Sequence, residues 1–84
     1  MNEMHERRET MQRMAHNVRR MRRLLGLTQP ELAEAANVSQ RMISQLENAQ
    51  IAPDCINAAN IAEVLNTTTE ALMRPVENTV PVKS

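Results

Sequence analysis

The chain has 84 residues and equal numbers of acidic and basic side chains, so we expect one small domain without net charge. Because Phe, Trp and Tyr are absent, the core must be built from Leu, Ile, Val, Ala and seven Met. The single cysteine, Cys55, excludes an internal disulfide and a cysteine-cluster metal site, and fits a reducing cytoplasm. No apolar run approaches the roughly 18 residues of a membrane span, and the charged N-terminus does not resemble a signal peptide.

Charge is unevenly distributed along the chain. Residues 1–25 hold seven Arg and three Glu, whereas residues 26–84 hold two Arg, one Lys and seven acidic residues. Such an asymmetry suggests an anionic partner. For residues 1–13 a solvated helix is the plainer alternative, because Glu3 with Arg7 and Glu9 with Arg13 have the spacing of helical ion pairs.

The first predicted element is an amphipathic helix that ends near Leu25. Gly26 follows it, at a position where a left-handed residue often ends a helix. The start of the helix is open between caps at Asn2 and Thr10. Apolar residues recur at intervals of three and four, which predicts a face for the core or for a dimer seam; they are Met11, Met14, Val18, Met21 and Leu25.

A second predicted helix begins at Thr28 and runs to about Ala36. Glu31 stands three residues after Thr28, which is the spacing of a capping box. Pro30 is tolerated there because it falls in the first turn.

A third predicted helix follows almost at once, capped by Ser39 and running to about Asn48. Two helices joined so tightly must cross at a steep angle. The crossing needs a small residue, Ala33, and the joint needs a residue that tolerates positive φ, Asn37. The residues expected to face the shared core are Leu32, Ile43 and Leu46.

The remaining chain predicts two more helices and a tail. A loop over residues 49–53 closes at Pro53, and the threonines at 67–69 before Glu70 indicate the cap of a short fifth helix through Met73. The sequence therefore predicts an all-α fold of five short helices at 14–73. An N-terminal extension at 1–13, helical or a basic arm, precedes them, and a polar tail at 74–84 follows. The fourth helix is marked by Ile56, Ala59, Ile61, Ala62 and Leu65.

The third predicted helix has one apolar side and one polar side. At about 100° per residue, Met42, Ile43 and Leu46 fall together. The opposite side holds one cation and no acid, and its residue types are those that hydrogen-bond to base edges. An ordinary wet helix surface is the plainer alternative, although such surfaces usually mix Glu and Lys. The polar residues are Gln40, Arg41, Ser44, Gln45 and Asn48.

The segments LGLTQPELAEAANVSQRMISQLEN and PDCINAANIAEVLNTTTEAL complete this pattern. Together they resemble the DNA-binding domain of the lambdoid phage repressor and Cro family, the XRE-type helix-turn-helix, over about residues 18–73. The resemblance implies double-stranded DNA as partner and a helix-turn-helix made by the second and third helices. It also implies base readout by Ser39, Gln40 and Arg41, with Ser44 and Gln45 one turn later.

The same resemblance assigns four further residues. It places phosphate contacts at Gln29 and Asn48, although Gln29 could serve only to start its helix. It pairs Arg22 with Glu47 in a structural ion pair. Two departures from the family pattern are Asn37 and Ala49, both at positions usually held by Gly. Asn accepts the same backbone region, but the loop after the third helix is expected to take another path.

No residues suggest an enzyme, a cofactor or a bound metal. Paired carboxylates, a nucleophile with its base and a phosphate-binding loop are all missing from the sequence. His5 and His16 stand eleven residues apart, so we expect them to be solvated, and we expect Cys55 to be partly buried.

The sequence therefore predicts a cytoplasmic, sequence-specific DNA-binding regulator, a repressor that binds a two-fold operator as a homodimer. The small core and the apolar Leu72 and Met73 point to a dimer contact through the fifth helix, with the methionines of the first helix as the alternative. Three rival functions stay open: an antitoxin that also binds a toxin, a restriction–modification controller protein, and a protein-interaction module without DNA binding.

Overall fold

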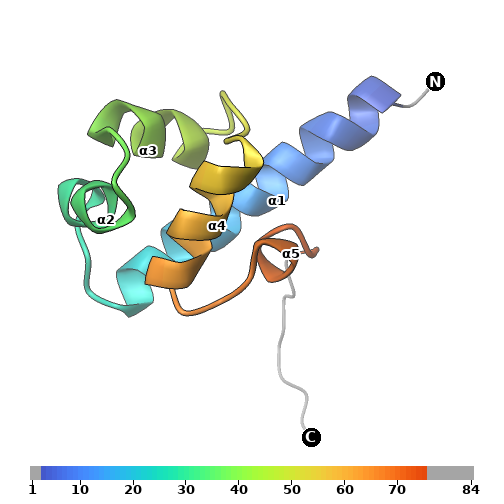
Figure 1. The fold of residues 1–84 in the computed structure, drawn as a ribbon. Coiled ribbons are helices and arrows are strands. Elements are labelled where there is room, and N and C mark those ends of the chain that lie inside the picture. Colours follow the sequence, from blue (N-terminus) through green and yellow to red (C-terminus); the bar gives the residue numbers. More distant parts are fainter. Residues whose placement is uncertain (1–2, 76–84) are drawn as a thin grey trace, which may run out of the picture.

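The computed structural model describes residues 3–75, with side chains from residue 6 onward. Within residues 3–75 the chain is all-helical, as predicted, and contains no strand. Predictions for Asn2, the side chain of His5 and most of the tail, residues 76–84, lie outside the described residues. No helix of the described chain is long and apolar enough to cross a membrane. The elements are α1 (Glu3–Leu24), α2 (Gln29–Ala36), α3 (Gln40–Glu47), α4 (Cys55–Val64) and α5 (Thr69–Leu72) (Figure 1).

Helix α1 is one continuous helix of 22 residues, and its N-terminal part projects beyond the other helices (Figure 1). Residues 3–13 therefore continue α1. Thr10 does not cap it, because Thr10 lies inside the helix and its hydroxyl donates to the carbonyl of Glu6 at 3.0 Å. The predicted C-terminal end is confirmed: Gly26 has φ 74°, and its N–H donates to the carbonyl of Arg23 at 3.0 Å.

The caps of α2 and α3 are those that the sequence predicts. The Thr28 hydroxyl accepts from the N–H of Glu31 at 3.1 Å, and the Glu31 carboxylate accepts from the N–H of Thr28 at 2.8 Å. The Ser39 hydroxyl accepts from the N–H of Met42 at 3.0 Å. Between the two helices, Asn37 has φ 60° and ψ 43°, the left-handed conformation expected at the joint.

The core lies where α2, α3 and α4 meet and continues along α1 and α5. Helix α2 packs against α3 and α4, while α1 packs against α3 and α5. The three residues predicted to face the α2–α3 core are buried, and Ala33 is buried with them. The largest fully buried side chains are Val18, Leu32, Ile43, Leu46, Ile61, Leu65 and Leu72.

The predicted apolar face of α4 is wrong at two positions. Ile56 is 70% exposed and Ala59 is also exposed. Helix α4 begins at Cys55, where the Asp54 carboxylate accepts from the N–H of Asn57 at 2.8 Å. The face that meets α2 and α5 therefore follows the spacing of three and four from residue 58 instead of residue 56. Its buried residues are Ala58, Ile61, Ala62 and Leu65.

The loop after α3 keeps a left-handed turn in spite of its alanine. Ala49 has φ 58°, a conformation that normally favours glycine. Its N–H donates to the carbonyl of Leu46 at 3.0 Å, and the N–H of Gln50 donates to the carbonyl of Gln45 at 2.8 Å. Ala49 thus adopts the conformation that a glycine would favour at this position, and these hydrogen bonds close the end of α3.

Candidate nucleic-acid interface

The predicted base-reading residues lie together on α3. Gln40 and Arg41 are exposed in its first turn, and Ser44 and Gln45 are half-exposed one turn later. The hydroxyl of Ser39 already accepts the capping hydrogen bond from Met42, so its proton remains available as a donor. The helix therefore offers side-chain donors and acceptors at its N-terminal end and along one side.

The outward side of α3 carries one cation and no carboxylate. The only acidic residue of the helix is Glu47, which is 3% exposed and turned inward. No acidic residue stands in the first turn of α3, whereas Glu31 stands in the first turn of α2. Since the N–H groups of a first turn attract anions, the N-terminus of α3 is the better placed of the two to meet a phosphate.

A buried ion pair anchors the other end of α3. Arg22 of α1 donates from Nε to Oε2 of Glu47 at 2.6 Å and from Nη2 to Oε1 at 3.0 Å. Its third nitrogen, Nη1, donates to the carbonyl of Leu27 at 2.8 Å. The hydrogen bond to Glu47 raises the pKa of Arg22 above its ordinary value, with burial opposing and the charge of Glu47 adding to the rise. The guanidinium therefore remains charged and holds α3 at a set angle to α1.

Gln29 joins this ion pair, which the sequence did not suggest. Its Nε2 donates to Oε1 of Glu47 at 3.1 Å, so the first residue of α2 is tied to the last residue of α3. The side chain is half-exposed. One hydrogen of the amide group is used by this bond, and the second is free to donate elsewhere.

Like Gln29, Asn48 forms one internal hydrogen bond and keeps further amide groups accessible at the end of α3. It is the C-cap residue, and its Nδ2 donates to the carbonyl of Ser44 at 3.0 Å. The side chain is exposed, so its oxygen and its second amide hydrogen are accessible. Both residues expected to contact phosphate thus lie beside the anchored end of α3.

A sequence profile of the helix-turn-helix family matches residues 18–72, well over half of the chain. The chain belongs to the XRE-type helix-turn-helix family. As members of this family do, it has the fold of a DNA-binding regulator, with α2 and α3 as the helix-turn-helix. Comparison with curated proteins and with solved structures gave no match.

Two other expectations for this helix-turn-helix protein concern His16 and Cys55. His16 is exposed. Cys55 is also exposed, which corrects the expectation of partial burial: it is the first residue of α4, outside the face that enters the core. Within the described residues, no group of three or more His, Cys, Asp or Glu side chains could hold a metal ion.

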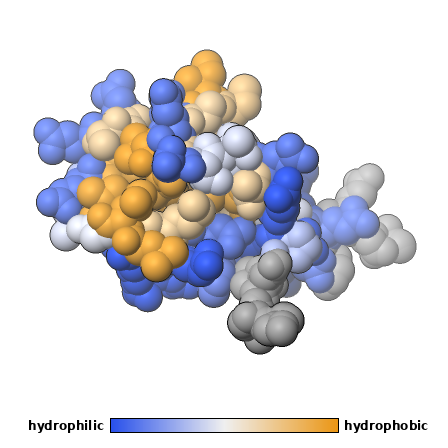
Figure 2. All heavy atoms as spheres, turned by 90° about the horizontal axis from the view of Figure 1, so that it is seen from below, coloured by the Kyte–Doolittle hydropathy of each residue, from blue (hydrophilic) through white to orange (hydrophobic). Residues whose placement is uncertain are grey.

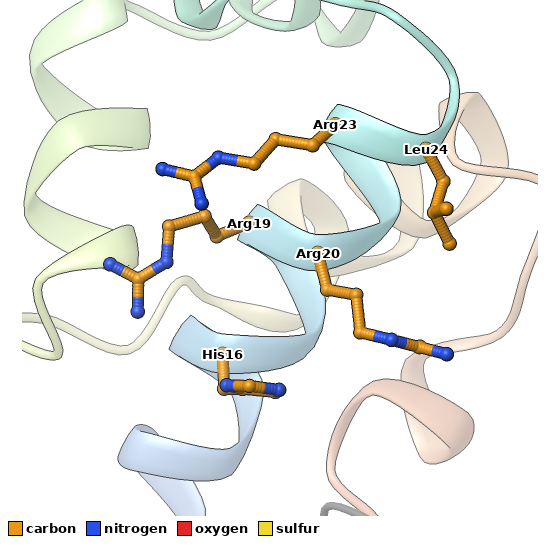
Figure 3. Close-up of a pocket in the computed structure, with 5 residues that line it drawn as sticks. All are labelled: His16, Arg19, Arg20, Arg23 and Leu24. Carbon is orange, nitrogen blue, oxygen red and sulfur yellow. The ribbon is translucent and has the colours of Figure 1, made fainter.

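A basic hollow on α1 was missed by the sequence reasoning, which noted only the net charge of this region. The hollow is open, has a volume of about 360 Å³, and is lined by His16, Arg19, Arg20, Arg23 and Leu24 (Figure 3). The spacing of three and four among these residues could have indicated it, because it places them on neighbouring positions of one helix face.

Proposed function

We propose that this DNA-binding protein is a cytoplasmic repressor that reads a specific operator through α3 and binds the two halves of a two-fold site as a homodimer. One observation carries the proposal: α3 turns its only carboxylate inward, onto Arg22, and leaves Gln40 and Arg41 exposed in the first turn. In helix-turn-helix proteins this is the end of the second helix that enters the major groove.

The chemistry of the exposed residues fits base readout. The guanidinium of Arg41 matches the O6 and N7 acceptors of guanine, and the amide of Gln40 matches the donor and acceptor of adenine. Ser44 and Gln45 lie on the following turn and can reach neighbouring base pairs. Ser39 remains a donor at the N-terminus of α3.

Phosphate contacts supply position and affinity without reading sequence. Gln29 and Asn48 are suited to this role because each has an accessible donor and a second hydrogen bond that fixes its side chain. The hydrogen bond to Glu47 fixes the amide of Gln29, whose second hydrogen stays free to donate.

The readout by α3 is tested by selecting binding sites from a randomised duplex pool, with wild type, Gln40→Ala, Arg41→Ala and Gln29→Ala. We expect Arg41→Ala to cost roughly 1–3 kcal/mol on the selected operator and to relax the preference at one base pair per half-site. Gln29→Ala should weaken all sequences about equally. Thermal unfolding of Arg41→Ala should stay within about 0.5 kcal/mol of wild type, because the side chain is exposed.

If the two α3 variants keep the wild-type preference at every position, α3 is not the reader. If no duplex binds even at low salt, the chain acts as a protein-interaction module instead.

The homodimer is supported by large apolar side chains that the monomer leaves exposed. Hydrophobic side chains gather on the face seen in Figure 2. Leu72, which we expected at the dimer contact, is only 1% exposed and belongs to the monomer core, as does Met14 of the methionine series. The large apolar residues that stay exposed in the described chain are Leu24, Leu25, Ile56 and Met73.

Sedimentation equilibrium tests the dimer. At tens of micromolar we expect twice the chain mass of 9.5 kDa. Leu24→Ser with Leu25→Ser should shift the protein toward the monomer if these residues are in the contact, while Glu34→Ser, an exposed position on α2, serves as the control. A protein that is monomeric both alone and on an operator duplex would contradict the homodimer.

A further inference from the structure

Three arginines on the C-terminal half of α1 form no side-chain hydrogen bond within the described chain. Arg20 and Arg23 are exposed and Arg19 is half-exposed. Within residues 6–75 none of the three guanidinium groups forms an ion pair, whereas Arg13 pairs with Glu9 and Arg22 with Glu47. Three like charges on adjacent turns repel one another, and no carboxylate in the described chain offsets them. An anion bound there would remove this repulsion.

The three arginines do not all point the same way. At about 100° per residue, Arg19 and Arg23 lie roughly 60° and 100° around α1 from Arg22, whereas Arg20 lies roughly 160° away. Arg22 itself reaches Glu47 at the C-terminal end of α3. Figure 3 shows the guanidinium groups of Arg19 and Arg23 directed toward α3, and that of Arg20 directed away from it.

The position of α3 links these two arginines to the reading surface. Helix α1 packs against α3, so the two arginines stand beside the helix that carries Ser44, Gln45 and Asn48. Glu47 is the one acidic residue of α3, but its carboxylate oxygens are already bonded to Arg22 and Gln29. A positive potential therefore flanks α3 even though the whole chain carries no net charge.

We propose that Arg19 and Arg23 bind DNA phosphates beside the base pairs read by α3, which makes α1 a third DNA-contacting element. This inference rests on the proposed DNA recognition by α3. A guanidinium presents a fork of donors that matches phosphate oxygens, and phosphate contacts are sequence-independent. Helix α1 thus contributes affinity and orientation, while discrimination between sequences stays with α3.

The salt dependence of binding tests the inference, because each phosphate contact releases counterions. The probe is a fluorescein-labelled 30-bp duplex of mixed sequence, titrated at 50 to 200 mM salt with wild type, Arg19→Gln/Arg23→Gln, Arg23→Gln and Arg20→Gln. Arg20→Gln is the matched control, since it removes an exposed charge from the same helix on the side away from α3. Circular dichroism checks that each variant is folded, and Arg19→Lys/Arg23→Lys keeps the charge at both positions.

Each lost contact should lower the slope of log affinity against log salt by about 0.9, so the double variant should lose about 1.8. Between 50 and 200 mM salt, wild type should therefore lose roughly tenfold more affinity than the double variant. Arg20→Gln should change the slope by less than half as much as Arg23→Gln, and the double Lys variant should keep the wild-type slope.

An unchanged slope in the double Gln variant would overturn the role of α1 while leaving readout by α3 intact. Equal losses for Arg20→Gln and Arg23→Gln would mean that α1 acts only through its general charge, which also overturns the inference. Absence of any DNA binding by wild type would instead refute the proposed function itself.

Discussion

The two ends of α3 differ in what they contact. At the N-terminal end, Gln40 and Arg41 are exposed, and the only side-chain hydrogen bond is the capping bond of Ser39. At the C-terminal end, Glu47 is buried and its carboxylate oxygens accept three hydrogen bonds, two from Arg22 and one from Gln29. One end is left open to an outside partner, and the other is held by α1 and α2.

Under the proposed function, this difference places the residues for recognition and those for stability at opposite ends of a helix of eight residues. A side chain that reads bases must exchange water for a base edge, so it is kept free of internal bonds in the unbound protein. The angle at which such a helix enters a groove must nevertheless be set in advance, because ordering it on binding would reduce affinity. We therefore expect changes at the C-terminal end to act on unfolding and changes at the N-terminal end to act on specificity.

The largest effect should come from removing the anchor. In Glu47→Ala, Arg22 keeps a buried charge without its partner, which costs about 3 kcal/mol or more. In a domain of this size that is a large share of the total free energy of unfolding. Denaturant unfolding of Glu47→Ala, Arg22→Ala and the double variant measures both the loss and the coupling between the two residues.

The control for this cycle is Glu34→Ala, which removes an exposed carboxylate from α2 and should change stability by less than about 0.5 kcal/mol. Additive effects of the two single variants, with coupling below about 0.5 kcal/mol, would show that the ion pair does not anchor α3. The contrast between the two ends of the helix would then be lost.

We expect a smaller change in the free energy of unfolding from substitutions in the two turns that flank α3. Asn37 and Ala49 have nearly the same φ, 60° and 58°. Asn visits this region at modest cost, whereas the Cβ of Ala makes it unfavourable by roughly 1 kcal/mol. We therefore expect Ala49→Gly to stabilise the protein by about 1 kcal/mol and Asn37→Gly to change it by less than about 0.5 kcal/mol, measured by denaturant unfolding.

Equal gains from both substitutions would mean that the two residues carry the same backbone strain. A loss of stability in Ala49→Gly would mean that packing of the alanine methyl, which is half-buried, outweighs the strain. In either case the C-terminal turn would not be the more strained of the two.

Local features were predictable to within a residue or two. Thr28, Ser39 and Thr68 cap their helices, as the capping patterns predict. In each case the side-chain hydroxyl accepts a hydrogen bond from the backbone N–H three residues later. The left-handed conformation of Asn37 and of Gly26 also follows from the residue types. These features depend on contacts within four residues, so a single sequence contains the information needed to find them.

Packing was harder to predict where two registers were possible. At the N-terminal end of α4 the chain could have buried either Ile56 and Ala59 or Ala58 beside the predicted residues Ile61, Ala62 and Leu65, and it buries Ala58. Leu72 was expected at a dimer contact, but it completes the core of the monomer. Neither choice is visible in the sequence, because it depends on which face of the helix the neighbouring helices reach.

The sequence by itself determined the five helices, the caps of α2, α3 and α5, the short joint between α2 and α3, and the polar, acid-free side of α3. These follow from local hydrogen bonding and from the period of the helix. Only the tertiary structure decided that Gln29 joins Arg22 on the carboxylate of Glu47, and that Arg19 and Arg23 point toward α3 while Arg20 does not. Those relations depend on the angle at which α1 crosses α3, and that angle is set by the packing of buried side chains far apart in the chain.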